Sequence, residues 1–224
     1  QLYNVFDLTH QACNGLLHLH SMTPKIIHRD VKPSNILLIS EGGCHRVRLC
    51  DFGIAREVDG SDLTEGANVG TKTYQAPELY ADSQSYTEKV DVFALGIVLL
   101  QLLCYERSHS VRLEETLIGM VKDKYKTIGH FIHMTRKEFP VDDLRLSSVS
   151  DVFKEEVISV IRSMIRNKSH RRTSVQKIQG EIEKCQITIM TPPRCGPQSS
   201  TSRAPQTEPA LVPSTSTASQ TEPA

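Results

Sequence analysis

The sequence predicts a mainly α-helical domain followed by a disordered tail, and three of its features indicate this. Apolar residues recur at helical spacing from Leu2 to His20, which predicts an amphipathic helix. The segment Thr87–Tyr105 carries apolar residues on every side after its first turn, so we expect a helix buried in the middle of the domain. Residues 191–224 contain seven Pro, six Ser and six Thr and no aromatic residue, which leaves too little apolar surface for a packed core. We therefore predict a folded domain at residues 1–185 and a disordered Pro/Ser/Thr-rich tail at residues 186–224.

Three further amphipathic helices are predicted in the second half of the domain. Their expected ranges are Leu113–Val121, Ser150–Ile165 and Thr173–Cys185. Ser150 and Thr173 are the expected N-caps, since each side chain offers an oxygen to an unpaired amide of the first helical turn.

A short β-hairpin is predicted near the middle of the first half. Its two apolar strands, Ile36–Ile39 and Val47–Cys50, flank a turn that contains two glycines. After this hairpin the chain from Asp51 to Gln75 is polar and shows no sustained period, so we expect a long loop. Loops of this length without structure of their own are usually functional or disordered.

Charge and cysteine content limit the classes of partner. Lys plus Arg and Asp plus Glu are equal at 26 each, which gives no electrostatic reason to expect a nucleic acid or an anionic membrane as partner. No apolar run is long enough to span a bilayer. The six cysteines form no CxxC pair, which favours free thiols in a soluble, cytoplasmic protein.

Three short motifs carry the chemistry, and they follow one another in a fixed order. The octet HRDVKPSN begins at His28, DFG begins at Asp51 after the predicted hairpin, and APE begins at Ala76. This order and context resemble the catalytic loop, the metal-binding loop and the end of the activation segment of eukaryotic protein kinases. The resemblance covers roughly residues 2–185 and implies the kinase C-terminal lobe, a helical bundle around a buried central helix. It implies a protein serine/threonine kinase that transfers the γ-phosphoryl group of ATP to a protein hydroxyl, with Mg²⁺.

The residue types at these positions suit phosphoryl transfer, which needs positioned groups and charge neutralisation. By resemblance, Asp30 orients the attacking hydroxyl and takes its proton, and Lys32 offsets charge on the transferring phosphoryl group. Asn35 and Asp51 supply the hard oxygen ligands that Mg²⁺ prefers. Lys32, Asn35, Asp51 and Leu37 form the implied nucleotide-binding set, with Leu37 as the floor under the adenine ring.

Other positions are implied to be structural rather than chemical. His28 and Phe52 resemble the internal hydrophobic stack of the family, and Asp91 on the buried helix resembles the residue that braces the catalytic loop. Arg171 is implied to form an ion pair with Glu78. Arg29 and Gly53 complete the structural set implied by the resemblance.

Substrate class and regulation rest on a few residues. Lys32 and Thr71 resemble serine/threonine kinases rather than tyrosine kinases, although dual specificity stays open. Thr71 is interpreted as a substrate-loop residue that contacts Asp30. Arg29 resembles the arginine that pairs with an activation-loop phosphate in some kinases, and Ser61 and Thr64 are the candidate phosphorylation sites.

The sequence contains no GxGxxG loop and no segment that could build the N-terminal lobe, which we expect in a longer parent protein. The chain alone is therefore expected to bind ATP poorly. Two alternatives remain open: a catalytically inactive, truncated binding or regulatory module, and a non-catalytic interaction protein built around the tail.

Overall fold

The described part of the molecule is rich in helices and carries two small sheets. The computed structural model describes residues 2–41, 44–58, 69–80, 85–104, 125, 127–143, 149 and 151–190. Residues 1–192 form one compact unit, and in the described part each sheet has two strands. The predicted helix-rich class is confirmed. None of the described helices is both long and apolar enough to cross a membrane.

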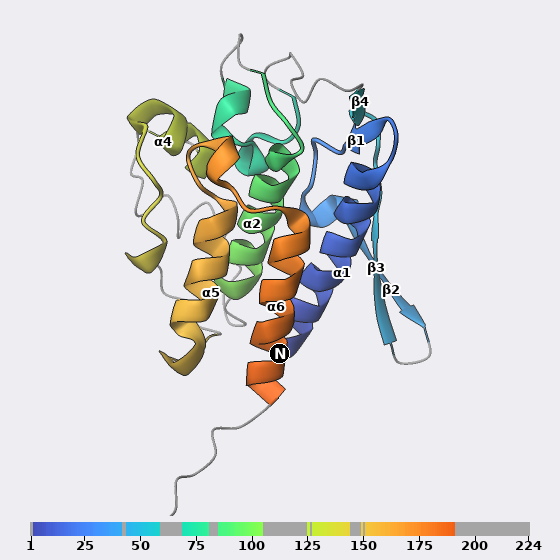
Figure 1. Cartoon of the computed structure of the whole chain (residues 1–224), viewed down its shortest axis with the longest axis vertical. Coiled ribbons are helices and arrows are strands. Elements are labelled where there is room, and N and C mark those ends of the chain that lie inside the picture. The colour runs from blue at the N-terminus through green and yellow to red at the C-terminus, as the bar shows by residue number, and fades with distance from the viewer. Residues whose placement is uncertain are drawn as a thin grey trace, which may run out of the picture. The chain divides into compact units, whose positions relative to one another are not determined.

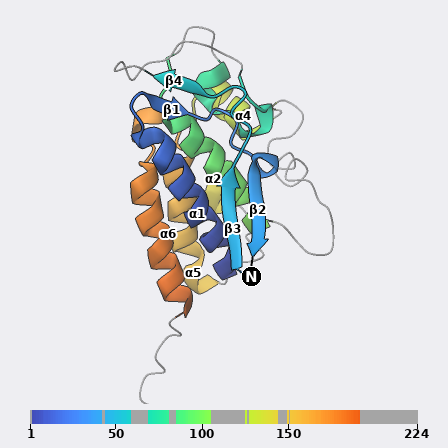
Figure 2. The ribbon, with the colours of Figure 1, turned by 90° about the vertical axis from the view of Figure 1, so that its right-hand side faces the viewer.

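Four helices pack side by side and form the main body of this unit. Figure 1 and Figure 2 show α2 (Lys89–Cys104) surrounded by α1 (Leu2–Ser21), α5 (Asp151–Met164) and α6 (Val175–Met190). Twelve of the sixteen residues of α2 are buried, as its apolar residues on all sides predict. The core therefore has α2 at its centre, and α1 confirms the predicted opening helix.

The predicted hairpin is present and is fastened to α1. Strand β2 (Ile36–Glu41) pairs antiparallel with β3 (Cys44–Leu49), and Figure 2 shows the pair beside α1. The Gln11 side chain of α1 donates to the carbonyl of His45 at 3.0 Å and accepts from the amide of Val47 at 2.9 Å. Because one amide side chain serves two backbone groups of β3, the hairpin has a fixed position on the helix.

The prediction of an unstructured loop from Asp51 to Gln75 is wrong in part. Residues Arg56–Val58 form strand β4, which pairs antiparallel with β1 (Lys25–Ile27), and Lys72–Tyr74 form a 3₁₀ turn. A strand of three residues is too short to show a periodic pattern in the sequence. Its stability depends on a partner strand about thirty residues away in the chain.

Two helix termini also differ from expectation. Ser174, not Thr173, begins α6, because its side-chain oxygen accepts from the amide of Lys177 at 3.3 Å and its carbonyl accepts from the amide of Ile178 at 3.0 Å. The helix continues to Met190, five residues beyond the predicted end. The predicted cap Ser150 and the predicted helix Leu113–Val121 lie outside the described residues.

One helix was not predicted. Helix α4 (Ile128–Thr135) begins at Thr127, whose side chain accepts from the amide of His130 at 3.0 Å, and ends at Arg136 in the left-handed conformation. The hydroxyl of Thr127 also bonds to that of Tyr80 at 2.7 Å, which joins α4 to the 3₁₀ turn Pro77–Tyr80.

Two helical glycines allow a matched test of this packing. A Cβ on Gly96 of α2 would lie 2.8 Å from Cγ2 of Ile165 and 2.9 Å from Cβ of Met164. A Cβ on Gly180 of α6 would meet nothing within 4 Å. We expect Gly96→Ala to lower the free energy of unfolding by about 1–3 kcal/mol through overpacking. Gly180→Ala is expected to raise it by about 1 kcal/mol through helix propensity. Urea denaturation of both variants measures the two changes, and equal shifts would contradict this packing.

Candidate active site

A buried carboxylate holds the segment that carries the HRD triplet. Asp91, in the first turn of α2 and fully buried, accepts hydrogen bonds from the backbone amides of His28 at 2.9 Å and Arg29 at 2.8 Å. A third bond joins it to Nε2 of His20 at 2.8 Å. The central helix thereby fixes the backbone immediately before Asp30.

The side chain of His28 connects this segment to the DFG triplet. Its Nε2 lies 3.0 Å from the carbonyl oxygen of Cys50, and its ring packs against Phe52 with 5.1 Å between ring centroids. The amide of Gly53 lies 3.4 Å from Oδ1 of Asp51, which closes the turn after the hairpin. The structure thus brings the predicted structural residues His28, Phe52 and Gly53 together around one turn.

Arg29 makes a second connection between the same two segments. Its backbone is left-handed, with φ 67°, and its Nε donates to the carbonyl of Ile54 at 2.5 Å. One terminal nitrogen donates to the hydroxyl of the buried Tyr86 at 2.8 Å. The guanidinium therefore joins the segment that carries the HRD triplet, named the catalytic segment below, to Ile54 directly after DFG and to Tyr86 just before α2.

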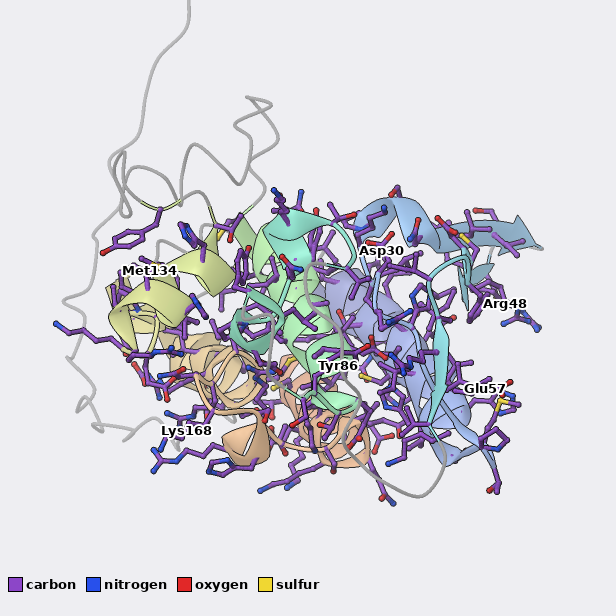
Figure 3. The ribbon with its side chains drawn as sticks, turned by 90° about the horizontal axis from the view of Figure 1, so that it is seen from above. Asp30, Arg48, Glu57, Tyr86, Met134 and Lys168 are labelled. Atoms are coloured by element: carbon purple, nitrogen blue, oxygen red, sulfur yellow. The ribbon has the colours of Figure 1, made fainter. Side chains whose placement is uncertain are left out.

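Four donors converge on the carboxylate of Asp30. Oδ1 accepts from the amide of Thr71 at 2.9 Å and from its hydroxyl at 2.8 Å. Oδ2 accepts from Nζ of Lys32 at 2.7 Å and from Nδ2 of Asn35 at 3.1 Å. Lys32 also donates to the hydroxyl of Thr71 at 2.9 Å. Figure 3 shows Asp30 between the hairpin side of the molecule, with Arg48, and the side that carries Met134 and Lys168.

These donors keep the carboxylate ionised. Partial burial would by itself raise the pKa of Asp30, but the hydrogen bonds from Lys32 and Thr71 and the Lys32 charge outweigh it, so the pKa lies below its usual range. Ionised and held at both oxygens, Asp30 suits the positioning of a hydroxyl group better than strong proton abstraction.

Asn35 contacts this carboxylate, and Asn35 and Asp51 are the candidate ligands for a Mg²⁺ ion. The amide of Cys50 donates to the carbonyl of Asn35 at 3.0 Å, so Asp51 directly follows a residue bonded to Asn35. Nδ2 of Asn35 donates to both the carbonyl and the carboxylate of Asp30, at 2.9 and 3.1 Å. This orientation leaves the amide oxygen of Asn35 for a metal, and together with the Asp51 carboxylate it gives the hard oxygen ligands that Mg²⁺ takes.

Two apolar side chains on the segments that carry Asn35 and Asp51 face solvent. Leu37 on β2 is 48% exposed, and Phe52 is 47% exposed. Apolar groups of this size beside polar ligands favour contact with a flat apolar ligand or another segment of protein. The predicted adenine floor, Leu37, is therefore accessible.

The residue before Thr71 allows this segment to approach the catalytic segment closely. Gly70 has φ +86°, and a Cβ there would lie 2.4 Å from the carbonyl oxygen of Arg29. Only glycine combines this backbone conformation with this approach, so the Thr71 contacts with Asp30 depend on it. The candidate phosphorylation sites Ser61 and Thr64 lie outside the described residues.

The predicted ion pair between Glu78 and Arg171 is wrong, because the partner of Glu78 is Arg172. Its two terminal nitrogens donate to the two carboxylate oxygens at 2.6 and 2.7 Å. The 3₁₀ turn Ser169–Arg171 ends just before Arg172, whose extended backbone directs the side chain inward, over the ring of Phe93 at 5.0 Å. Arg171 is exposed.

Several residues of this network were missed by sequence reasoning. The sequence does not indicate which of the adjacent Arg171 and Arg172 is buried, because this depends on the residue at which the 3₁₀ turn ends. The glycine at position 70 was a readable signal, since glycine before a functional loop residue often marks a left-handed backbone. Nothing local indicated the contacts of His20 or Tyr86, because their partners are distant in the chain.

The two arginines allow a direct test of the correction. We expect Arg172→Met to lower the free energy of unfolding by about 3–5 kcal/mol, because it leaves the carboxylate of Glu78 without its buried partner. Arg171→Met should change it by at most about 0.5 kcal/mol, as for an exposed side chain. Urea denaturation measures both, and a larger loss for Arg171→Met would contradict the pairing.

The titration of Asp30 provides a second test. We expect Thr71→Val to raise the pKa of Asp30 towards its usual range, because one hydroxyl donor to the ionised form is lost. Because folding lowers the pKa of Asp30, these bonds contribute their full stability at pH values above the pKa of Asp30 in the unfolded chain. That contribution is lost as the pH falls through the pKa of Asp30 in the folded chain. Carbon-13 NMR of the Asp30 carboxyl group measures the shift. The control Thr188→Val, on the exposed face of α6, should leave the titration unchanged. Identical curves for wild type and Thr71→Val would contradict this account.

Comparison with known sequences agrees with this geometry. The chain is 31% identical over 177 residues to the wall-associated receptor kinase-like 10 of Arabidopsis thaliana, covering 76% of this chain and 21% of the relative. It is 43% identical over 109 residues to a probable serine/threonine-protein kinase of Dictyostelium discoideum, covering 47% of this chain and 11% of the relative. It is 49% identical over 89 residues to a mitogen-activated protein kinase kinase of Aspergillus fumigatus, covering 40% of this chain and 16% of the relative. The chain thus spans well under two thirds of each of these relatives.

A family-wide comparison covers more of the chain than each of these three pairwise matches. The protein kinase domain matches residues 3–181, a range that includes the HRD, DFG and APE triplets. The chain belongs to the protein kinase domain family.

Proposed function

We propose that the protein to which this chain belongs is a serine/threonine kinase that transfers the γ-phosphoryl group of ATP to a protein hydroxyl. The proposal rests on the carboxylate of Asp30, which accepts hydrogen bonds from Lys32, Thr71 and Asn35. Asn35 in turn is bonded to Cys50, the residue before Asp51. The Dictyostelium relative, named as a probable serine/threonine-protein kinase, supports the same reaction.

In this proposal, Asp30 holds the substrate hydroxyl in place. The four donors already occupy both carboxylate oxygens, so the substrate hydroxyl would take the place of one of them while the remaining donors keep the carboxylate oriented. As the hydroxyl oxygen bonds to the γ-phosphorus, the bond from that phosphorus to the bridging oxygen breaks, ADP leaves, and the proton of the hydroxyl passes to Asp30. Positioning is the larger contribution, because phosphoryl transfer requires little covalent assistance from the protein.

Lys32 and the oxygen ligands manage the negative charge. Lys32 lies 2.7 Å from Asp30, so its ammonium group is next to the place where the hydroxyl attacks. The oxygens of Asn35 and Asp51 would hold Mg²⁺, which supplies neutralisation of the charge on the phosphates. Leu37 would contact the adenine ring through its exposed apolar surface.

Preference for serine and threonine is the finer part of the proposal. Thr71 donates two hydrogen bonds to Asp30 and accepts one from Lys32. This small residue therefore lies beside the carboxylate to which the substrate hydroxyl would bind. A short aliphatic hydroxyl reaches Asp30 in that space more readily than a bulky phenol. The contact between Lys32 and Thr71 therefore supports the substrate class for which both residues were singled out.

We also propose that the residues described form the C-terminal lobe of the kinase. The exposed side chains of Leu37 and Phe52 favour a second lobe that closes over the nucleotide, supplied by the parent protein. Residues 1–185 would then belong to the lobe, whose last helix continues to Met190, and the tail would follow this helix. Phosphorylation of Ser61 or Thr64 as an activating switch stays a prediction, as does a cytoplasmic location.

The test uses the full-length parent protein, with radiolabelled ATP and three peptides that differ only in a Ser, Thr or Tyr acceptor. We expect phosphorylation of the Ser and Thr peptides. Asp30→Asn should lower kcat by roughly 10²–10⁴-fold, as for the loss of a positioned acid–base group. Asp142→Asn is the matched control, because Asp142 bonds only to Arg162 at the surface among the described residues.

Two results would contradict the proposal. Transfer that persists at the wild-type rate in Asp30→Asn would remove the assigned role of Asp30. Phosphorylation of the Tyr peptide in preference to the other two would overturn the substrate class while leaving the reaction intact.

A further inference from the structure

A polar pocket of about 630 Å³ lies apart from Asp30, where three segments of the chain meet. One segment is the end of the activation segment and the residues that follow it, a second follows α4, and a third is the loop between α5 and α6. The lining residues are Pro77, Glu78, Ser85, Arg136, Asn167, Lys168, Ser169 and His170. Its volume is within the range of ligand-binding clefts, about 300–1,000 Å³.

The charge of this pocket is unbalanced. Arg136 and Lys168 are exposed at its wall with the imidazole of His170, and no described residue forms a hydrogen bond or ion pair with these three side chains. Glu78 is the one carboxylate in the lining, and both of its oxygens already accept from Arg172. Two cations that have no counter-charge among the described residues therefore line the same hollow, which favours an anionic ligand.

The backbone around these cations is held in place before any ligand arrives. Nδ2 of Asn167 donates to the carbonyl of Arg136 at 2.7 Å. The backbone amide of Asn167 donates to the carboxylate of Glu138 at 2.8 Å. The carbonyl of Lys168 accepts from the amide of Arg171 at 2.9 Å within the 3₁₀ turn. The segments that carry Arg136 and Lys168 are thus bonded to each other, which lowers the ordering cost of binding.

We propose that this pocket binds the phosphate group of a phosphoserine or phosphothreonine in a protein substrate. A phosphate monoester carries close to two negative charges and three acceptor oxygens, which suit an arginine and a lysine on one wall. The pocket also offers far more room than one phosphate needs, so peptide on either side of the phosphate can be accommodated.

Its position relative to Asp30 favours a substrate over a free anion. Thr71 contacts Asp30, and Pro77 of the pocket follows six residues later on the same segment. Six residues span at most about 20 Å, so a substrate of about seven residues could reach from Asp30 to the pocket. Figure 3 shows Lys168 on the α4 side of the molecule, away from the hairpin residue Arg48. Assigning the phosphate to a substrate rests on the proposed function, but anion binding does not.

The experiment is an NMR titration of the ¹⁵N-labelled 224-residue chain without nucleotide. The probes are a seven-residue Ala/Gly peptide with one phosphoserine, the same peptide with serine, and inorganic phosphate. We expect saturable shifts at the amides of Arg136 and Lys168–His170 with the phosphopeptide. The serine peptide and inorganic phosphate should each bind at least about tenfold more weakly, since charge-assisted hydrogen bonds and peptide contacts are each lost.

Charge-reversal variants locate the binding. Arg136→Glu and Lys168→Glu should each weaken phosphopeptide binding by about tenfold or more. The control Lys177→Glu makes the same charge change on the exposed face of α6 and should leave binding unchanged. Thermal melting confirms that each variant is folded, and Lys168→Gln serves as a milder substitute.

Three results would overturn the proposal. Equal binding of the phosphorylated and unphosphorylated peptides would remove the role of the phosphate. Inorganic phosphate that binds here as tightly as the phosphopeptide would assign the pocket to a free anion. An equal loss in Lys177→Glu would show diffuse attraction rather than a site. None of these results bears on phosphoryl transfer by Asp30, which the kinase assay tests separately.

Discussion

The position of the catalytic segment depends on the buried carboxylate of Asp91. Two successive amides, of His28 and Arg29, donate to this one group, and the left-handed backbone of Arg29 sets the direction in which the chain continues to Asp30. Asp30 is the next residue, so its place follows from a helix whose own position is set by core packing on nearly every side. Asp30, the proposed catalytic residue on a loop, thereby gains the rigidity of the centre of the fold.

The segment from Thr71 to Glu78 is bonded at both ends to the same rigid unit. At one end Thr71 bonds to Asp30, and at the other Glu78 bonds to the buried Arg172, which comes from the start of the last helical region. The eight residues between these ties, counting both, cannot move away from the catalytic segment without breaking one of them. Gly70 permits the first tie, and the turn before Arg172 permits the second.

The sequence was informative where the signal is local and less so where it depends on distant contacts. The buried helix, the opening helix and the hairpin followed from periodicity over long windows. The motif order led to Asp30 and to the donors that surround it. Strand β4 and the burial of Arg172 rather than Arg171 could not be read, because each depends on a partner or a turn far away in the chain. The N-cap shifted by one residue because Thr173 and Ser174 are chemically equivalent as caps.

The polar and the apolar parts of the proposed site differ in how complete they are. The carboxylate of Asp30 already has donors on both oxygens, whereas Leu37 and Phe52 remain about half exposed. The groups proposed to act on the phosphoryl group and the hydroxyl are therefore held in place by this unit alone. The groups that should contact the adenine ring and a second lobe are not. In a kinase built this way, the second lobe would contribute chiefly to nucleotide affinity and closure, while the geometry around the attacking hydroxyl would already be set by the α2 core.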